Sequence, residues 1–437
     1  MRGRNSYSGS EAGVVDVYRM TGPSSTLLSP QAAGPSRLAL QSFVMCTAML
    51  LAIGTIMVFS ASITAQPSQQ DQIYLSRHLL FLTGAVGTGT IAALLPGSFW
   101  RSISPFLFLL TLAAIGAVLV PGIGTRVNGA QRWIRLGPIS IQPSETAKIT
   151  LTLLLARLVS TQRDKPTIGG RLLLAGTFLI TAVLVVIEPD LGTTVFLTIL
   201  FALVLFLGGW PIKEFIAAGV VTLPVIASVL VLKPYQWKRL EGFVTTWTHP
   251  EEAPYQVRQS LTTLGVGGLS GTGLGEGWQK LSFLPEANTD FIFSVIGEEL
   301  GLWGTLGVAA LWLSFFYFGL KLLRQHPTKS FPAIAGTALL CQLVIQAAIN
   351  IGVVTAVLPP KGISHPFISY GGSSLMVSCA AVGIIISLAS SPVEYRVSQL
   401  VDAEDTAPTD DDPEQLRTAP DGGTDGNESS VPAPFGA

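Results

Sequence analysis

The chain has little charge and few cysteines for its length. Only 12% of its 437 residues are Asp, Glu, Lys or Arg, and the net charge is −1. Low charge excludes a large soluble core, and the absence of a basic excess excludes an electrostatic nucleic-acid partner. Cys46, Cys341 and Cys379 all lie in apolar runs, which excludes a disulfide framework and a cysteine metal site. The mean hydropathy of +0.52 is typical of a polytopic membrane protein.

Ten apolar runs are long enough to cross a membrane, which predicts an all-α polytopic membrane protein with about ten transmembrane helices. The runs cover about 38–62, 78–96, 102–121, 143–161, 171–187, 190–209, 213–232, 291–321, 331–358 and 372–391. The polar segment before them shows no cleavable signal, so we expect a disordered tail over 1–37. We expect a transmembrane domain over 38–391 and an acidic disordered tail over 392–437.

The distribution of Lys and Arg predicts which loops face the cytoplasm. With a cytoplasmic N-terminus, the inside segments carry fifteen of these residues and the outside segments ten, and five of the ten fall in one long loop. Long loops count little in the positive-inside rule, so both termini are expected to be cytoplasmic. This orientation places a large extracytoplasmic loop over 233–289.

The segment Leu281–Gly301 combines four acids, Glu286 among them, with the start of an apolar run. Asp290 lies one residue before the run, at the predicted outer face. Glu298 and Glu299 lie inside it, about 12–13 Å further along a helix. Carboxylates at membrane depth are costly and therefore functional candidates. Two simpler interpretations stay open: Asp290 caps the helix, or Glu298 and Glu299 pair with buried basic groups and hold helices together.

Three further polar clusters are predicted at or near the outer face. Residues 129–148 contain Arg132 and Trp133, then Glu145 and Lys148, which share a helix face and could form an internal ion pair. Glu188 and Asp190 flank a proline in a turn that could be a solvated hairpin. Residues 358–374 contain Lys361, His365, Ser369 and Tyr370 among turn-forming Pro and Gly. The convergence of acids and bases at one end of a bundle predicts a wet cavity for a charged substrate.

A glycine-rich run occupies residues 265–277 of the predicted outer loop. It has no Gly-Lys-Ser/Thr ending and follows no clear strand, so it is not a nucleotide-phosphate loop. A tightly turned segment, re-entrant or lying at the surface, is expected instead. Such backbone is tolerated at membrane depth only where protein or a wet cavity covers it.

The motifs together resemble the SEDS family, the shape, elongation, division and sporulation proteins. They are GAQRWI with QPSETAK, EPDLGT, YQVRQS with GTGLG, LPEANTDFIFSVIGEELG, and LPPKGISHPFISYGGSS. They follow the family's order over about 38–391, and Lys361 in LPPKGI is more similar to the division branch than to the elongation branch. Asn288 and His249 depart from the family's pattern, but neither replaces Asp290.

The resemblance implies a peptidoglycan glycosyltransferase that polymerises lipid II at the outer face of the bacterial cytoplasmic membrane, at the division septum. Asp290 would be the general base, and undecaprenyl pyrophosphate would leave with inversion at the MurNAc C1. Arg132, Lys148, Arg239 and Lys361 are candidates to bind the pyrophosphate, and Trp133 to stack on sugar or hold the lipid. Glu145, Glu188, Asp190, Glu286 and Ser369 complete the candidate substrate site.

The resemblance also bears on cofactors and partners. A divalent cation, Mg or Mn, would fit at the pyrophosphate, but no ligands for it can be identified in the sequence. No other cofactor is expected. The expected partners are a class B penicillin-binding transpeptidase and other division proteins. An elongation-type polymerase, a lipid II flippase and a non-catalytic scaffold stay open as alternatives.

The predicted orientation is testable by cysteine labelling. A cysteine introduced at Gly273, in the 233–289 loop, should react with a membrane-impermeant reagent added from outside. Labelling only from the cytoplasmic side would contradict the orientation.

Overall fold

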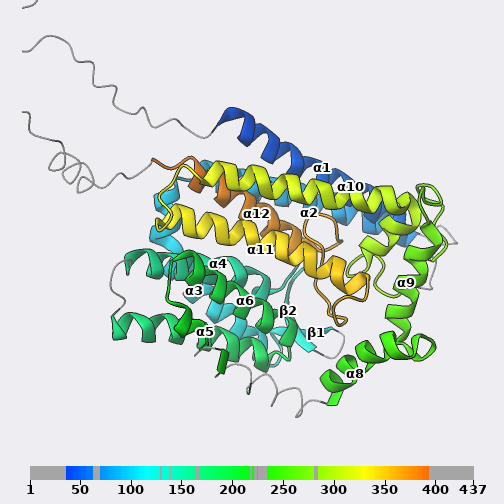
Figure 1. The fold of residues 1–437 in the computed structure, drawn as a ribbon, viewed down its shortest axis with the longest axis horizontal. Coiled ribbons are helices and arrows are strands. Elements are labelled where there is room, and N and C mark those ends of the chain that lie inside the picture. Colours follow the sequence, from blue (N-terminus) through cyan, green and yellow to red (C-terminus); the bar gives the residue numbers. More distant parts are fainter. Residues whose placement is uncertain are drawn as a thin grey trace, which may run out of the picture. The chain divides into compact units, whose positions relative to one another are not determined.

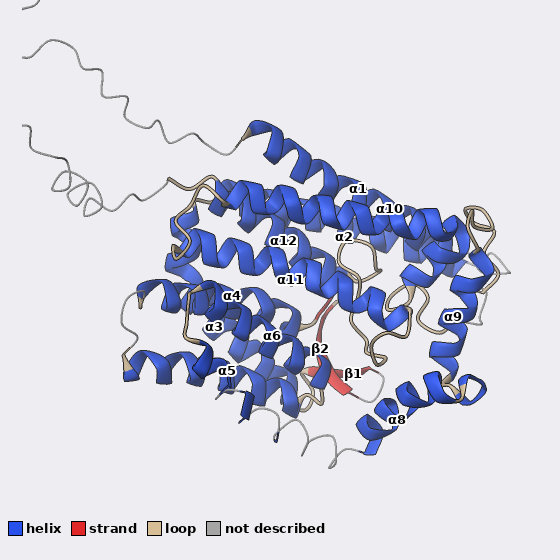
Figure 2. Ribbon diagram, viewed as in Figure 1, coloured by secondary structure: helices blue, strands red, loops and turns tan. Residues whose placement is uncertain are grey.

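The computed structural model describes residues 36–62, 69–127, 130–137, 139–162, 167–216, 219–220, 224, 234–279 and 284–392. Helices dominate, as predicted (Figure 2). They are α1 (Arg37–Ser62), α2 (Gln69–Leu94), α3 (Gly97–Leu119), α4 (Pro143–Thr161), α5 (Ile168–Ile187), α6 (Leu191–Leu207), α8 (Pro234–Thr248), α9 (Tyr255–Gly267), α10 (Ile292–Leu323), α11 (Phe331–Val354) and α12 (Gly372–Ala389), with a short 3-10 helix at Pro250–Glu252.

Nine of the ten predicted runs overlap one of these helices, and α4 has the predicted bounds. The seventh run, 213–232, falls largely outside the described residues. So do the predicted tails, before Ser36 at the N-terminus and after Pro392 at the C-terminus. Within the described ranges, α1, α3, α5, α10, α11 and α12 are long and apolar enough to span a membrane. The protein is therefore an integral membrane protein, although these helices alone do not establish a count of ten.

Helices distant in sequence pack side by side around an apolar core. In Figure 1, α10 runs along α1 on one side and α11 on the other, and α12 packs against α2 and α11. Phe43 of α1 stacks on Phe315 of α10 with ring centroids 4.6 Å apart. Gly319 of α10 faces Phe43 and Leu340 of α11, and its missing side chain lets the three helices meet closely.

Among the described residues, a small antiparallel sheet departs from the all-α prediction. Its order is β1 (Gly124–Val127), β2 (Ala130–Leu136) and β3 (Ile139–Ile141). The sequence indicates only a polar cluster over 129–148, because strands of three to seven residues give too weak an alternation to stand out. The β2–β3 hairpin turns at Gly137, whose φ of +60° favours glycine. The sheet carries Arg132 and Trp133 on β2.

Helix α10 is broken at Gly301, where φ is +65° and ψ is −162°. A straight helix would bond the amides of Leu302 and Trp303 to the carbonyls of Glu298 and Glu299. Instead, Leu302 and Trp303 donate to Gly268 and Leu269, at 3.0 and 3.4 Å. Residues 268–279, here called the glycine loop, thus occupy the break.

The glycine loop also satisfies the carbonyls that the break releases. The amides of Thr272 and Gly273 donate to the carbonyls of Glu298 and Glu299, at 2.9 and 3.1 Å. The expected tightly turned segment is therefore confirmed for 268–277, whereas Gly265–Gly267 still belong to α9. Gly273 has φ of +110°, which disfavours a side chain, so the exposed Leu274 is the better position for the labelling cysteine.

Hydroxyl and backbone donors hold the two buried acids of α10. The amides of Trp278 and Gln279 donate to Oε1 of Glu298, at 2.7 and 3.0 Å. The Ser60 hydroxyl of α1 and the Gly275 amide donate to Glu299. These contacts join α10 to α1 and to the glycine loop, so the acids hold elements together, as one interpretation proposed.

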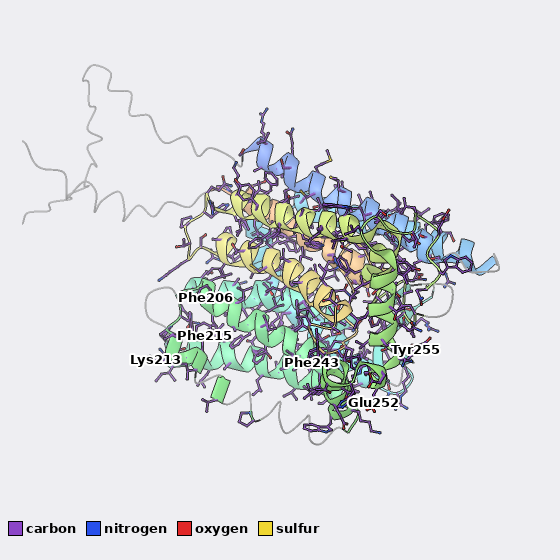
Figure 3. The ribbon with its side chains drawn as sticks, turned by 45° about the vertical axis from the view of Figure 1, so that its right-hand side comes forward. Phe206, Lys213, Phe215, Phe243, Glu252 and Tyr255 are labelled. Carbon is purple, nitrogen blue, oxygen red and sulfur yellow. The ribbon has the colours of Figure 1, made fainter. Side chains whose placement is uncertain are left out.

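The two predicted sides of the membrane lie at opposite ends of the helices. Figure 3 places Phe206, Lys213 and Phe215, around the turn after α6, at one end and Phe243 and Tyr255, of α8 and α9, at the other. The start of α1 and the end of α12 both lie toward the α6 turn (Figure 1). This arrangement agrees with termini on one side, and the cytoplasmic assignment of that side stays a prediction.

The break predicts a specific glycine requirement. Gly301→Ala should destabilise the protein by about 1–3 kcal/mol, because the backbone region is nearly exclusive to glycine. In addition, a Cβ would lie 2.4 Å from the Gly271 amide nitrogen. Thermal unfolding in detergent would show a lower melting temperature.

Gly307→Ala in the same helix is the matched control. Its Cβ would meet nothing within 4 Å, so alanine should be neutral or stabilise by about 0.5–1 kcal/mol. Equal melting temperatures for the two variants would contradict the importance of the break.

Candidate functional site

Asp290 lies just outside α10 and does not cap it. The N-cap is Phe291, which makes no side-chain cap hydrogen bond, so the capping interpretation is wrong. The Asp290 carbonyl accepts from the Asn350 side chain of α11 at 2.8 Å, which fixes the backbone. A Cβ placed on Gly362 would lie 3.0 Å from Oδ2 of Asp290, so the carboxylate faces the segment that carries Lys361.

That segment, residues 358–371 between α11 and α12, is here called the lysine loop. Polar side chains of α11 position it: Asn350 donates to the Ile363 carbonyl at 2.8 Å and Gln346 to the Ser364 carbonyl at 3.0 Å. The Ser369 hydroxyl donates to the Thr289 carbonyl and accepts from the His365 amide. Ser369 therefore connects the lysine loop to the residue before Asp290.

The turn between α5 and α6 forms the third part of the site. Glu188 and Asp190 are 0% and 7% exposed, so the solvated-hairpin interpretation is wrong. Asp190 accepts from the Thr193 amide and hydroxyl at the start of α6, and Nη1 of Arg132 lies 3.5 Å from its Oδ2. Arg132 also donates to the carbonyls of Glu188 and Pro189, so the sheet is fixed to this turn.

Lys361 lies between the turn and Asp290. A Cβ on Gly192 would be 3.6 Å from Cδ of Lys361 and 3.5 Å from Oδ1 of Asp190. On the other side, Arg239 of α8 reaches the Pro360 carbonyl at 3.5 Å. The structure thus brings Arg132, Asp190, Lys361, Arg239 and Asp290, predicted from five separate segments, into one cluster of mixed charge.

Two charges of this cluster have no partner within the described residues. Neither the Asp290 carboxylate nor the Lys361 ammonium makes a hydrogen bond or an ion pair there. Burial and the neighbouring Glu286 raise the pKa of Asp290 to about 7, against the opposing charge of Arg239. Burial lowers the pKa of Lys361 from its ordinary value, with Asp190 opposing and Arg239 adding to the shift. These properties suit a base and an anion-binding cation.

Glu188 has a different environment. Both carboxylate oxygens are buried and make no hydrogen bond in the described part of the chain. Burial, then the Asp190 charge, raise its pKa to about 8, although Arg132 lowers it. The side chain is consequently protonated near neutral pH and adds no negative charge beside Arg132.

Glu145 and Lys148 form the predicted ion pair, with Oε1 and Nζ 2.7 Å apart. Lys148 also donates to Oε1 of Gln346 at 3.0 Å. Because Gln346 holds the lysine loop, the pair is connected to the site through one amide. Gln346, Asn350 and Gly362 were not among the predicted site residues, although two amides one helical turn apart in an apolar run are a signal for such a role.

The remaining candidates lie at the edge of the cluster. Glu286 is exposed and accepts from the Thr289 hydroxyl at 2.9 Å. Trp133 follows Arg132 on β2, so its side chain points to the opposite face of the strand. Its stacking on substrate stays a prediction. Across the described residues, no group of three or more His, Cys, Asp or Glu side chains is close enough to hold a metal.

Comparison with known proteins supports the resemblance. Residues 40–393 match the FtsW, RodA and SpoVE family, described as "Cell cycle protein". The chain belongs to this family. A relative from Coxiella burnetii is 38% identical over 79% of this chain and 95% of its own, and one from Nitrosococcus halophilus is 39% identical over 77% and 88%. Each of these two family members is named a probable peptidoglycan glycosyltransferase FtsW.

Solved structures of the family share the fold. A chain from "Structural coordination of polymerization and crosslinking by a peptidoglycan synthase complex" superposes with a TM-score of 0.66, 24% identity, and coverage of 80% of this chain and 97% of that one. The rod shape determining protein RodA of Thermus thermophilus gives 0.59 and 25% identity, with coverage of 79% and 95%.

The Glu145–Lys148 pair provides a test of the site's support. Glu145→Gln or Lys148→Gln alone should destabilise the protein by about 3–5 kcal/mol, because each leaves one buried charge without its partner. The double variant Glu145→Gln, Lys148→Gln should be more stable than either single variant, as measured by thermal unfolding. A double variant no more stable than the singles would contradict a role as a compensated pair.

Proposed function

We propose that the protein is a peptidoglycan glycosyltransferase that polymerises lipid II at the outer face of the cytoplasmic membrane during cell division. One observation carries the proposal: within the described residues Asp290 is an unpaired carboxylate, with a pKa of about 7, and it faces the segment that carries Lys361, likewise unpaired there. The family and the names of the relatives support the reaction class.

In the proposed reaction, Asp290 is the general base. It takes the proton from the GlcNAc 4-hydroxyl of the incoming lipid II, and the oxygen attacks C1 of MurNAc on the growing strand. A new C1–O bond forms while the bond to pyrophosphate breaks and its electron pair leaves with undecaprenyl pyrophosphate. A single displacement inverts C1. Base assistance of this kind is worth about 10²–10⁴-fold, and positioning supplies further acceleration.

Lys361 and Arg239 would bind the departing pyrophosphate. Lys361 is partly desolvated and lacks an ion pair in the described structure, so an arriving dianion would stabilise its charged form. Arg132 is engaged with Asp190 and two carbonyls, and Lys148 with Glu145 and Gln346. We therefore assign these two cations to building the site. A divalent cation would draw most of its ligands from the pyrophosphate, because the described side chains offer no three-ligand set.

The proposal includes a partner and an orientation. A class B penicillin-binding transpeptidase would crosslink the strands made here, and the synthase complex among the structural neighbours supports such a pairing. The termini would lie in the cytoplasm, with Asp290 and the lysine loop at the outer headgroup level. A flippase would not need a base at Asp290, and a scaffold would need neither unpaired charge.

Asp290→Asn is the decisive variant. Because Asp290 makes no cap hydrogen bond, the substitution should leave folding intact. An amide cannot accept the proton, so the rate of glycan-strand formation from purified lipid II should fall at least about 10²-fold. The wild-type rate should rise with pH through about 7, since Asp290 is protonated and inactive as a base below that value.

Glu252→Gln, at an exposed acid of the 3-10 helix outside the cluster, is the control and should keep most of the activity. A folded Asp290→Asn protein that polymerises at the wild-type rate would show that another group is the base. Absence of strands from the wild-type protein, alone and with its transpeptidase, would favour the flippase or the scaffold.

A further inference from the structure

The first part of α10 is a separate rigid segment that carries Asp290 at its beginning. It comprises residues 292–300, about 13 Å of helix, and ends at the break. The break removes two of the helical hydrogen bonds that would join it to the rest of α10, those of the Leu302 and Trp303 amides. The position of Asp290 therefore depends on the contacts at the two ends of this segment.

Contacts at the Asp290 end fix the backbone. Asn350 donates to the Asp290 carbonyl, and the hydroxyls of Ser294 and Ser260 are 2.8 Å apart, which connects the segment to α9. A Cβ on Gly267 would lie 1.8 Å from the Gly297 carbonyl oxygen, so α9 and the segment meet backbone to backbone. The segment and α9 thus pack as one body.

Glu298 holds the other end. Its Oε1 accepts from two successive amides of the glycine loop, those of Trp278 and Gln279. Its Oε2 makes no hydrogen bond in the described part of the chain, but a Cβ on Gly277 would lie only 2.8 Å from it. The glycine loop therefore contacts both oxygens of the Glu298 carboxylate. A shift of the loop relative to residues 292–300 would break these contacts.

We propose that Glu298 is a positioning residue: its carboxylate locks the glycine loop onto residues 292–300 and so sets where Asp290 lies relative to Lys361. The inference rests on the proposed function, because Asp290 must act as the base for its position to matter. Displacement of a reacting group by about 1 Å can reduce a rate by about 10²-fold, so a loosened segment should slow the chemical step.

The test measures kcat and KM for lipid II with full-length protein. Glu298→Ala should lower kcat by about tenfold or more with KM changed less than about twofold, because the substrate contacts are untouched. Glu298→Gln retains an oxygen acceptor and should recover kcat to within about threefold of wild type. Ser387→Ala removes a comparably buried hydrogen bond, to Leu95 between α12 and α2, and should leave kcat unchanged.

Gly277→Ala probes the same contact from the loop side and gives an answer if Glu298→Ala fails to fold. Its Cβ would press on the Glu298 carboxylate, so kcat should again fall while KM stays constant. The proposal is overturned if the folded Glu298→Ala protein, or Gly277→Ala in its place, keeps wild-type kcat, or if Ser387→Ala loses as much. Failure of the wild-type protein to form strands would instead overturn the proposed function.

Discussion

The architecture depends on satisfying backbone hydrogen bonds where a membrane helix is interrupted. Four polar groups released at Gly301 would be costly in a lipid environment, where water cannot replace their partners. The glycine loop supplies a donor or an acceptor for each of them. This exchange explains why the loop is rich in glycine: its amides must approach the helix to hydrogen-bonding distance, and Gly271 and Gly273 have positive φ. The separation of residues 292–300 from the rest of α10 is a consequence of the same exchange.

Hydropathy was sufficient to predict most of the helices, because an apolar stretch in a membrane protein can adopt few structures other than a helix. It also indicated several of the candidate residues, since charges that interrupt such stretches are conspicuous. It did not reveal the sheet, whose strands are too short, or the amides Gln346 and Asn350, which resemble ordinary polar residues of a packed helix. Nor could it reveal that backbone amides and a serine hydroxyl would hold Glu298 and Glu299, because a sequence records side chains and not the direction of N–H groups.

The electrostatics of the site combine compensated and uncompensated charges. Arg132 with Asp190, and Glu145 with Lys148, are paired and support the geometry. Asp290 and Lys361 have no ion-pair partner in the part of the chain that the structure describes, and partial desolvation moves both toward their neutral forms. The ion pairs thus stabilise the fold around the site. Asp290 and Lys361 can interact with the negatively charged substrate that we propose.

The contact between α1 and the lysine loop bears on how the protein is made. A Cβ on Gly54 would lie 2.3 Å from the Phe367 carbonyl oxygen, so the buried part of the lysine loop rests directly on the first transmembrane helix. During synthesis, α1 leaves the ribosome about three hundred residues before the lysine loop does, and earlier segments generally fold first. The nascent chain therefore carries Arg132, Asp190 and Asp290 into the membrane without Lys361, and the site is complete only when synthesis is nearly finished.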